Sequence, residues 1–191
     1  PYTIQDHADD LIGLCRHVGI KKAVFCGLSV GGLIVQSLYL KKPELVRKIV
    51  LSNTAHKIGT PEIWNPRIDA VERGGIESVA DGVLERWFTP DFRERRRAEL
   101  AGYRNMLVRQ DATGYAETCR ADFTATVSGI RVPVLAISGD QDGSTPPDLV
   151  KSTAGMISGA RFEVLPSCGH IPCVEQPGKL AALLTAFIHG N

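Results

Sequence analysis

The sequence lacks an excess of charge of either sign. Its 191 residues contain 22 lysines and arginines against 21 aspartates and glutamates, a formal net charge of +1. A chain this close to neutral exerts no general attraction on nucleic acid or on an anionic membrane surface. No apolar run approaches the roughly 20 residues that cross a bilayer, and the first residues do not resemble a signal peptide. We therefore expect no nucleic acid or membrane partner and a cytoplasmic location.

Paired cysteines are also lacking. The five cysteines, at positions 15, 26, 119, 168 and 173, are an odd number without Cys-x-x-Cys pairs or histidines at zinc spacing. This pattern argues against a disulfide framework and a metal site, so we expect reduced thiols and no metal. No cofactor is expected. Cys26 lies within an apolar run, and we expect it to be a small buried residue.

Strand and helix patterns alternate at both ends of the chain. The chain is long enough, and with 43% hydrophobic residues apolar enough, to bury the core of one globular domain. A capping box at residues 3–6 opens a first helix, and a strand, a helix and a second strand follow. This strand–helix–strand order is the unit of a parallel sheet. The expected strands are 23–26, 45–52, 132–138 and 161–165, and the expected later helices are about 31–42, 148–157 and 177–189.

Residues 53–128 interrupt this alternation with helical patterns alone. Six apolar residues recur there at helical spacing: Ile76, Val79, Ala80, Val83, Leu84 and Trp87. Glycine and proline at 59–61, 74–75, 89–90 and 112–114 divide the stretch into short helices. We predict a helical lid at 53–128 between two core parts, 1–52 and 129–191.

The motif most indicative of chemistry is Gly27-Leu-Ser-Val-Gly31, between an apolar strand and a helix. A serine on such a turn has strained backbone angles, so we expect Gly27 and Gly31 where side chains would collide. The turn exposes the Ser29 hydroxyl and directs the Val30 N–H, with the positive end of the helix, toward a developing oxyanion. The same motif alone fits an ordinary tight turn, but its place between strand and helix favours a nucleophile.

A serine nucleophile requires a base that a third group holds in the right tautomer. Asp140 and Asp142 follow one predicted strand, and His170 follows the next. Loops after parallel strands meet at one edge of the sheet, so these residues can converge on Ser29. The pattern predicts a Ser-His-Asp triad in which one aspartate is the acid and the other serves the turn.

Three segments together resemble the triad segments of the α/β-hydrolase superfamily: residues 27–32, 139–147 and 168–177. In that superfamily the acid is the aspartate three positions after the glycine, which is Asp142 here. Further stretches resemble the 3-oxoadipate enol-lactonase family, namely residues 51–68, 114–119 and 175–177. Together these segments span nearly the whole chain. The triad motifs specify only the superfamily, whereas residues 53–68 indicate the lactonase.

The resemblance implies an α/β-hydrolase fold, with a mostly parallel sheet flanked by helices and an inserted helical lid. It also implies hydrolysis of a small enol-lactone by Ser29, His170 and Asp142. Trp64 and Arg67 would lie at the base of the lid, where they either touch substrate or pack the lid. Because lactone and product carry carboxylates, we expect Arg67 to be the cationic group near the nucleophile. Another carboxylesterase, a carbon–carbon bond hydrolase and a non-catalytic fragment that pairs with a second chain remain alternatives.

The sequence departs from the family at its start. The family has several strands before the helix that opens this chain, and one of their loops supplies a second oxyanion N–H from a His-Gly motif. The sequence contains no counterpart of them. A sheet that begins at Val24 would leave the edge and both faces of that strand uncovered. We therefore expect a missing N-terminal segment or a second chain, such as another copy in a homo-oligomer, to complete the sheet.

Overall fold

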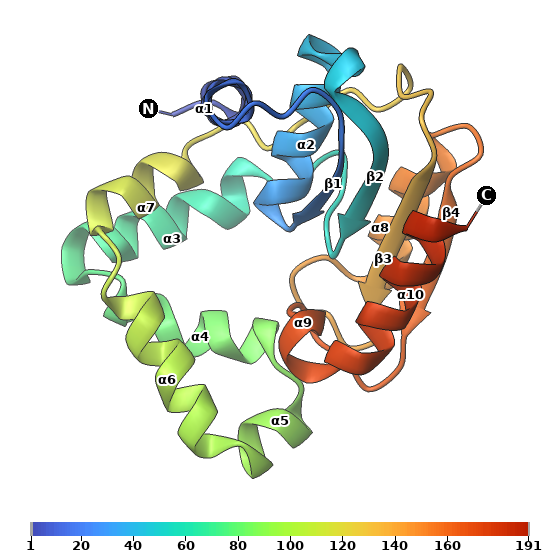
Figure 1. Cartoon of the computed structure of the whole chain (residues 1–191). Coiled ribbons are helices and arrows are strands. Elements are labelled where there is room, and N and C mark those ends of the chain that lie inside the picture. Colours follow the sequence, from blue (N-terminus) through green and yellow to red (C-terminus); the bar gives the residue numbers. More distant parts are fainter. Residues whose placement is uncertain (1, 191) are drawn as a thin grey trace.

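A four-stranded parallel sheet forms the core of the computed structural model, which describes residues 2–190 (Figure 1). The strands lie in the order of the chain: β1 (Ala23–Leu28), β2 (Val46–Ser52), β3 (Val134–Gly139) and β4 (Arg161–Leu165). All three neighbouring pairs are parallel. The carboxyl ends of the strands therefore meet at one edge of the sheet, as predicted.

Helices pack on both faces of the sheet. They are α1 (Ile4–His17), α2 (Val30–Lys41), α8 (Pro147–Gly155) and α10 (Pro177–His189), while η1 (Pro43–Leu45) and α9 (Pro172–Glu175) are short connections. Ile49 and Leu51 of β2 belong to a core shared with α1, α2 and α8, whereas Val50 belongs to a core shared with α10. This alternation follows from the two-residue period of a strand. The predicted parallel sheet flanked by helices is confirmed.

Five helices between β2 and β3 form a separate layer with its own apolar core (Figure 1). They are α3 (Pro61–Gly74), α4 (Glu77–Trp87), α5 (Pro90–Arg95), α6 (Arg97–Val108) and α7 (Ala112–Cys119). The two segments that join this layer to the core run side by side, with a bridge between Lys57 and Thr124 and a hydrogen bond of 3.0 Å from Ile58 N–H to Phe123 O. We call this layer the lid.

The apolar stripe predicted in the lid lies on α4 and the residue before it, with Ile76, Ala80, Val83 and Leu84 buried. The breaks predicted at 59–61, 74–75 and 89–90 separate elements. The fourth break separates α6 from α7 but falls at 109–111, just before the predicted 112–114, because α7 already begins at Ala112. There the Asp111 carboxylate accepts the Gly114 N–H at 2.6 Å and caps the helix.

Strand β1 lies at one edge of the sheet. Phe25 packs against the core shared with α2, so the expectation that both faces of this strand are uncovered is wrong on that side. Cys26 points to the other face, where the α10 core reaches Val50 of β2 but does not include β1. Cys26 is therefore exposed, and the prediction that it is buried is wrong.

Within residues 2–190, no helix is long and apolar enough to cross a membrane.

The turn between β1 and α2 is crowded at two glycines. A Cβ on Gly27 would lie 2.3 Å from the Gly31 carbonyl oxygen, and a Cβ on Gly32 would lie 2.3 Å from the Thr54 side chain. A Cβ on Gly31 would have no neighbour within 4 Å. The expected collision is therefore found at Gly27 but not at Gly31. Successive residues of a helix point about 100° apart, so Gly31 and Gly32 face different directions. Only Gly32 faces a close neighbour, the Thr54 side chain.

This geometry predicts opposite effects of alanine at two glycines of the same motif. Gly27→Ala should lower the free energy of unfolding by about 1–3 kcal/mol or more, because the backbone oxygen that it meets cannot move aside cheaply. Gly31→Ala should be neutral or stabilising by up to about 1 kcal/mol, because alanine favours a helix. Urea unfolding of both variants measures the difference, and equal losses would contradict the packing described.

Candidate active site

Ser29 stands at the junction of β1 and α2 with a positive φ, at φ 54° and ψ −122°. Few residues other than glycine adopt a positive φ, so the surrounding structure must hold it. The Ser29 N–H donates to Ser52 O at 3.1 Å, and the Ser29 carbonyl accepts from the Thr54 hydroxyl at 2.6 Å and the Gly32 N–H at 2.9 Å. Its own hydroxyl does not cap the helix, which leaves it free to face the adjoining cavity.

Helix α2 begins at the very next residue, Val30. The first N–H groups of a helix have no partner within it, and the helix dipole makes this end positive. Val30 lines the same cavity as Ser29. The arrangement therefore suits a negative charge that develops beside Ser29.

His170 and Asp142 form a buried pair, 3% and 4% exposed. His170 Nδ1 lies 3.0 Å from Asp142 Oδ1 and 2.9 Å from Oδ2. Asp142 lies in the loop after β3, and His170 lies in the loop after β4. His170 lines the same cavity as Ser29, so the structure brings the three predicted residues to one place.

Several donors converge on the Asp142 carboxylate. Oδ1 accepts the backbone N–H groups of Ser144 at 2.7 Å and Thr145 at 2.9 Å, and Oδ2 accepts the Thr145 hydroxyl at 2.8 Å. The Asn53 amide donates to Oδ2 at 2.9 Å. Burial alone would raise the pKa of Asp142, but the hydrogen bonds from His170, Thr145 and Asn53 outweigh it and lower the pKa. The carboxylate is therefore held ionised.

Asp140, the other candidate acid, has a different role in the loops. Its carboxylate accepts the Cys168 N–H at 3.0 Å, and its own N–H donates to Leu165 O at 3.0 Å. It thus joins the loop after β3 to the loop after β4 instead of facing His170. This is the turn chemistry that the sequence left open for one of the two aspartates.

The lid is bonded directly to the loop that carries His170. The His170 N–H donates to Trp87 O, the last residue of α4, at 2.8 Å. Glu175 accepts the Gly169 N–H at 2.7 Å on one oxygen, and the Thr89 N–H and hydroxyl at 3.0 and 2.6 Å on the other. The position of the lid and the position of His170 are therefore linked.

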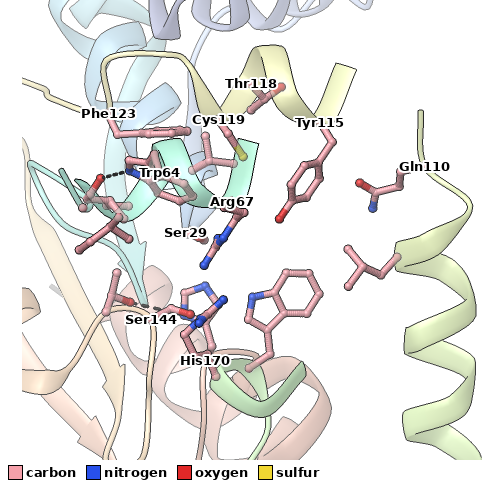
Figure 2. Close-up of a pocket in the computed structure, with 18 of the residues that line it drawn as sticks. Ser29, Trp64, Arg67, Gln110, Tyr115, Thr118, Cys119, Phe123, Ser144 and His170 are labelled. Atoms are coloured by element: carbon pink, nitrogen blue, oxygen red, sulfur yellow. Dashed lines mark hydrogen bonds between the residues drawn. The ribbon is translucent and has the colours of Figure 1, made fainter. Parts of the chain in front are cut away.

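A cavity of about 780 Å³ lies between the lid and the core (Figure 2). Ser29 and His170 lie at its core side, and Figure 2 shows Arg67 reaching toward both from α3, with Tyr115 of α7 across the space. Its lining also includes apolar and aromatic side chains from both layers: Val30, Ile58, Ile63, Trp64, Trp87, Leu107, Phe123 and Leu149. A small, largely apolar molecule with a polar group suits this space.

Trp64 both packs the base of the lid and lines the cavity. Its indole N–H donates to Ile58 O at 2.9 Å, and its ring lies 4.9 Å from that of Phe123. Arg67 lies one helical turn further on α3, with its guanidinium carbon 4.8 Å from the centre of the Trp64 ring. This stacking fixes the arginine at the wall of the cavity.

A second arginine, Arg86 on α4, also lines the cavity, and the sequence analysis missed it. It lies between Leu84 and Trp87 of the apolar stripe on α4, and only the fold brings it to Arg67 and Tyr115, so no local signal marked it. Burial and the nearby Arg67 lower the pKa of Arg86. Burial raises the pKa of the Tyr115 phenol, and Arg67 opposes that shift. Two guanidinium groups at one cavity favour a bound anion.

A serine on a strand-to-helix turn and a histidine paired with a buried aspartate, all at the carboxyl ends of parallel strands, are the arrangement of an α/β hydrolase. The model of the alpha/beta hydrolase family matches residues 1–183, and the chain belongs to this family. Within residues 2–190, no group of three or more histidines, cysteines, aspartates and glutamates could hold a metal ion.

Enol-lactonases are among the similar proteins. The chain is 36% identical to 3-oxoadipate enol-lactonase 2 of Acinetobacter baylyi, over 93% of this chain and 67% of that protein. It is 30% identical to 3-oxoadipate enol-lactonase 1 of the same organism, over 97% of this chain and 71% of that protein. The crystal structure of the enol-lactonase from Burkholderia xenovorans LB400 superposes with a TM-score of 0.94 at 38% identity, covering 98% of this chain and 74% of that one. These comparisons confirm the resemblance inferred from the sequence.

The lowered pKa of Asp142 predicts a pH-dependent effect of Asp142→Asn on stability. The folded pKa lies below the unfolded value near 3.8, so the stabilisation is complete above that value and is lost as the pH falls through the folded pKa. At pH 7 the variant should lose about 1–3 kcal/mol of unfolding free energy, because several donors lose their charged acceptor. Urea unfolding between pH 2.5 and 7 should show the gap between the two proteins narrowing below about pH 4. A gap that stays constant to pH 2.5 would contradict this account.

Proposed function

We propose that the protein is a carboxylic ester hydrolase that opens a small enol-lactone, 3-oxoadipate enol-lactone, to 3-oxoadipate. The Ser29 oxygen attacks the ring carbonyl while His170 takes the serine proton. The ring C–O bond then breaks, and His170 returns the proton to the leaving enol oxygen; the released enol tautomerises to the ketone as this proton is lost from oxygen and a proton is gained at the neighbouring carbon. A water molecule then loses a proton to His170 and attacks the acyl carbon, the ester bond to Ser29 breaks, and His170 returns that proton to the Ser29 oxygen as the acid leaves. The resemblance to this lactonase family would place the reaction in the cytoplasmic degradation of aromatic compounds.

The other residues of the site have supporting roles in this proposal. Asp142 holds His170 in the tautomer that accepts the serine proton on Nε2 and stabilises the imidazolium. The Val30 N–H, at the positive end of α2, donates to the oxyanion. The observation that carries the proposal is that Ser29 and the Asp142-bonded His170 line one cavity in a chain whose relatives include enol-lactonases.

We also propose that Trp64 and Arg67 bind substrate. The lactone combines a flat ring with a carboxylate, and the two side chains offer an aromatic face and a guanidinium at the cavity wall. A guanidinium binds a carboxylate with charge-assisted hydrogen bonds. Arg86 adds positive charge to the same cavity.

Replacement of the nucleophile tests the reaction. Ser29→Ala should lower kcat for the enol-lactone by a factor of about 10⁴ or more, since the triad acts as a unit. Ser158→Ala, at an exposed position after α8, is the matched control and should keep wild-type kcat. Lactone opening by Ser29→Ala at the wild-type rate would refute the mechanism.

A panel of the enol-lactone, aryl esters and ring-cleavage diketones tests the substrate class in the wild-type protein. We expect the highest kcat/KM for the lactone. Preference for an aryl ester would support a general carboxylesterase, and preference for a diketone would support a carbon–carbon bond hydrolase. If the protein turned over none of the three, the non-catalytic alternative would be favoured.

Truncation of Arg67 tests carboxylate recognition. Arg67→Ala should raise KM for the anionic lactone about tenfold or more while changing kcat less, because the guanidinium binds a part of the substrate that does not react. A neutral aryl ester should show little change in KM. Arg73→Ala, on an exposed position of α3, is the control. An unchanged KM for the lactone would leave Arg67 with a packing role only.

A further inference from the structure

Asn53 is a fully buried polar residue directly after β2, and sequence reasoning assigned it no role. It is 0% exposed and has a left-handed backbone with φ 49°. Asparagine and aspartate adopt this conformation more readily than most other side chains. Its own N–H donates to Ile137 O of β3 at 2.7 Å, which fixes its backbone to the neighbouring strand.

The Asn53 side chain joins the two loops that carry the predicted acid and base. Its amide nitrogen donates to Asp142 Oδ2 at 2.9 Å and to Gly169 O, beside His170, at 3.2 Å. Its amide oxygen accepts the Ser52 hydroxyl at 2.9 Å. The side chain is therefore held in the one orientation that presents its two N–H donors to these loops. An amide flipped by 180° would place its oxygen against the Asp142 carboxylate, where two acceptors repel.

The contact with Asp142 involves the same oxygen that lies 2.9 Å from His170 Nδ1. A donor on Oδ2 therefore restrains the carboxylate in the plane in which it faces the imidazole. The contact with Gly169 O restrains the backbone immediately before His170. The Asn53 side chain, at the end of β2, thus contacts both Asp142 and the backbone next to His170.

We infer that Asn53 is a positioning residue for the hydrolysis, fixing the Asp142 carboxylate and the backbone of His170 in their working orientation. This inference rests on the proposed function for its kinetic consequences. Asn53 acts through Asp142 and His170, and it does not line the cavity or touch substrate in this arrangement.

The expected signature is a change in pH dependence. Loss of the amide donor leaves the carboxylate with fewer hydrogen bonds, so the Asp142–His170 pair holds its proton more tightly. A second carboxylate at this position adds repulsion in the same direction. The variants leave in place the other ionisable groups around the pair and the cavity: Asp140, Cys168, Glu175, Arg67, Arg86 and Tyr115.

The test is the pH profile of kcat/KM for the enol-lactone in Asn53→Asp and Asn53→Gly. Both replacements tolerate a positive φ. The acid limb of this profile is the low-pH side, where activity falls as the Asp142–His170 pair takes up a proton. In Asn53→Asp this limb should move upward by about one pH unit, and kcat should fall about tenfold or more with little change in KM. Asn53→Gly should move the limb in the same direction by a smaller amount. Asn105→Asp, at an exposed position of α6, makes the same charge change far from the pair and should leave the profile unchanged.

A substrate-independent measurement separates this inference from the proposed function. The proton NMR signal of the His170 Nδ1–H hydrogen bonded to Asp142 should shift or disappear in both variants and persist in Asn105→Asp. That result would support the positioning role even if the lactone were not turned over by the wild type. Folded variants with a wild-type acid limb and an unchanged His170 signal would overturn the inference, whatever their thermal stability. Failure of both variants to fold would also overturn it, because Asn53 would then be a folding residue.

Discussion

The site depends on one buried negative charge, the Asp142 carboxylate. A carboxylate that is 4% exposed is costly unless donors surround it, and here donors from the loop after β3, from the loop after β4 and from the end of β2 converge on it. The parallel order of these strands is what brings the donors to one point. The same charge orients His170, so the bonds that stabilise the loops also orient the proposed base.

The lid has two consequences for this centre. Through Trp87 O and Glu175 it is bonded to the backbone around His170, so the part of the chain that covers the cavity also holds His170 in place. Through Arg67 and Arg86 it brings positive charge to the cavity of a protein whose overall charge is only +1. If the protein has the proposed function, its anionic substrate would therefore be attracted by local placement of charge and not by the protein as a whole.

The strands, most helices and the predicted acid–base pair follow from local signals in the sequence. Apolar periodicity predicted β4 and α10 at their observed bounds. The places of Asp142 and His170, directly after two parallel strands, predicted that the two side chains would lie together. The burial predicted for Cys26 was wrong because it rested on the apolar run alone, whereas the core around α10 does not reach across the sheet to β1. Asn53 and Arg86 were missed because each acquires its role from partners distant in sequence.

The most direct test of the central claim is labelling with a fluorophosphonate probe, followed by mass spectrometry of the modified peptide. The account predicts one label per chain on Ser29, formed more slowly in the presence of saturating enol-lactone because both compete for one site. A label on another residue, or labelling of Ser29 at a rate that the lactone does not change, would contradict it.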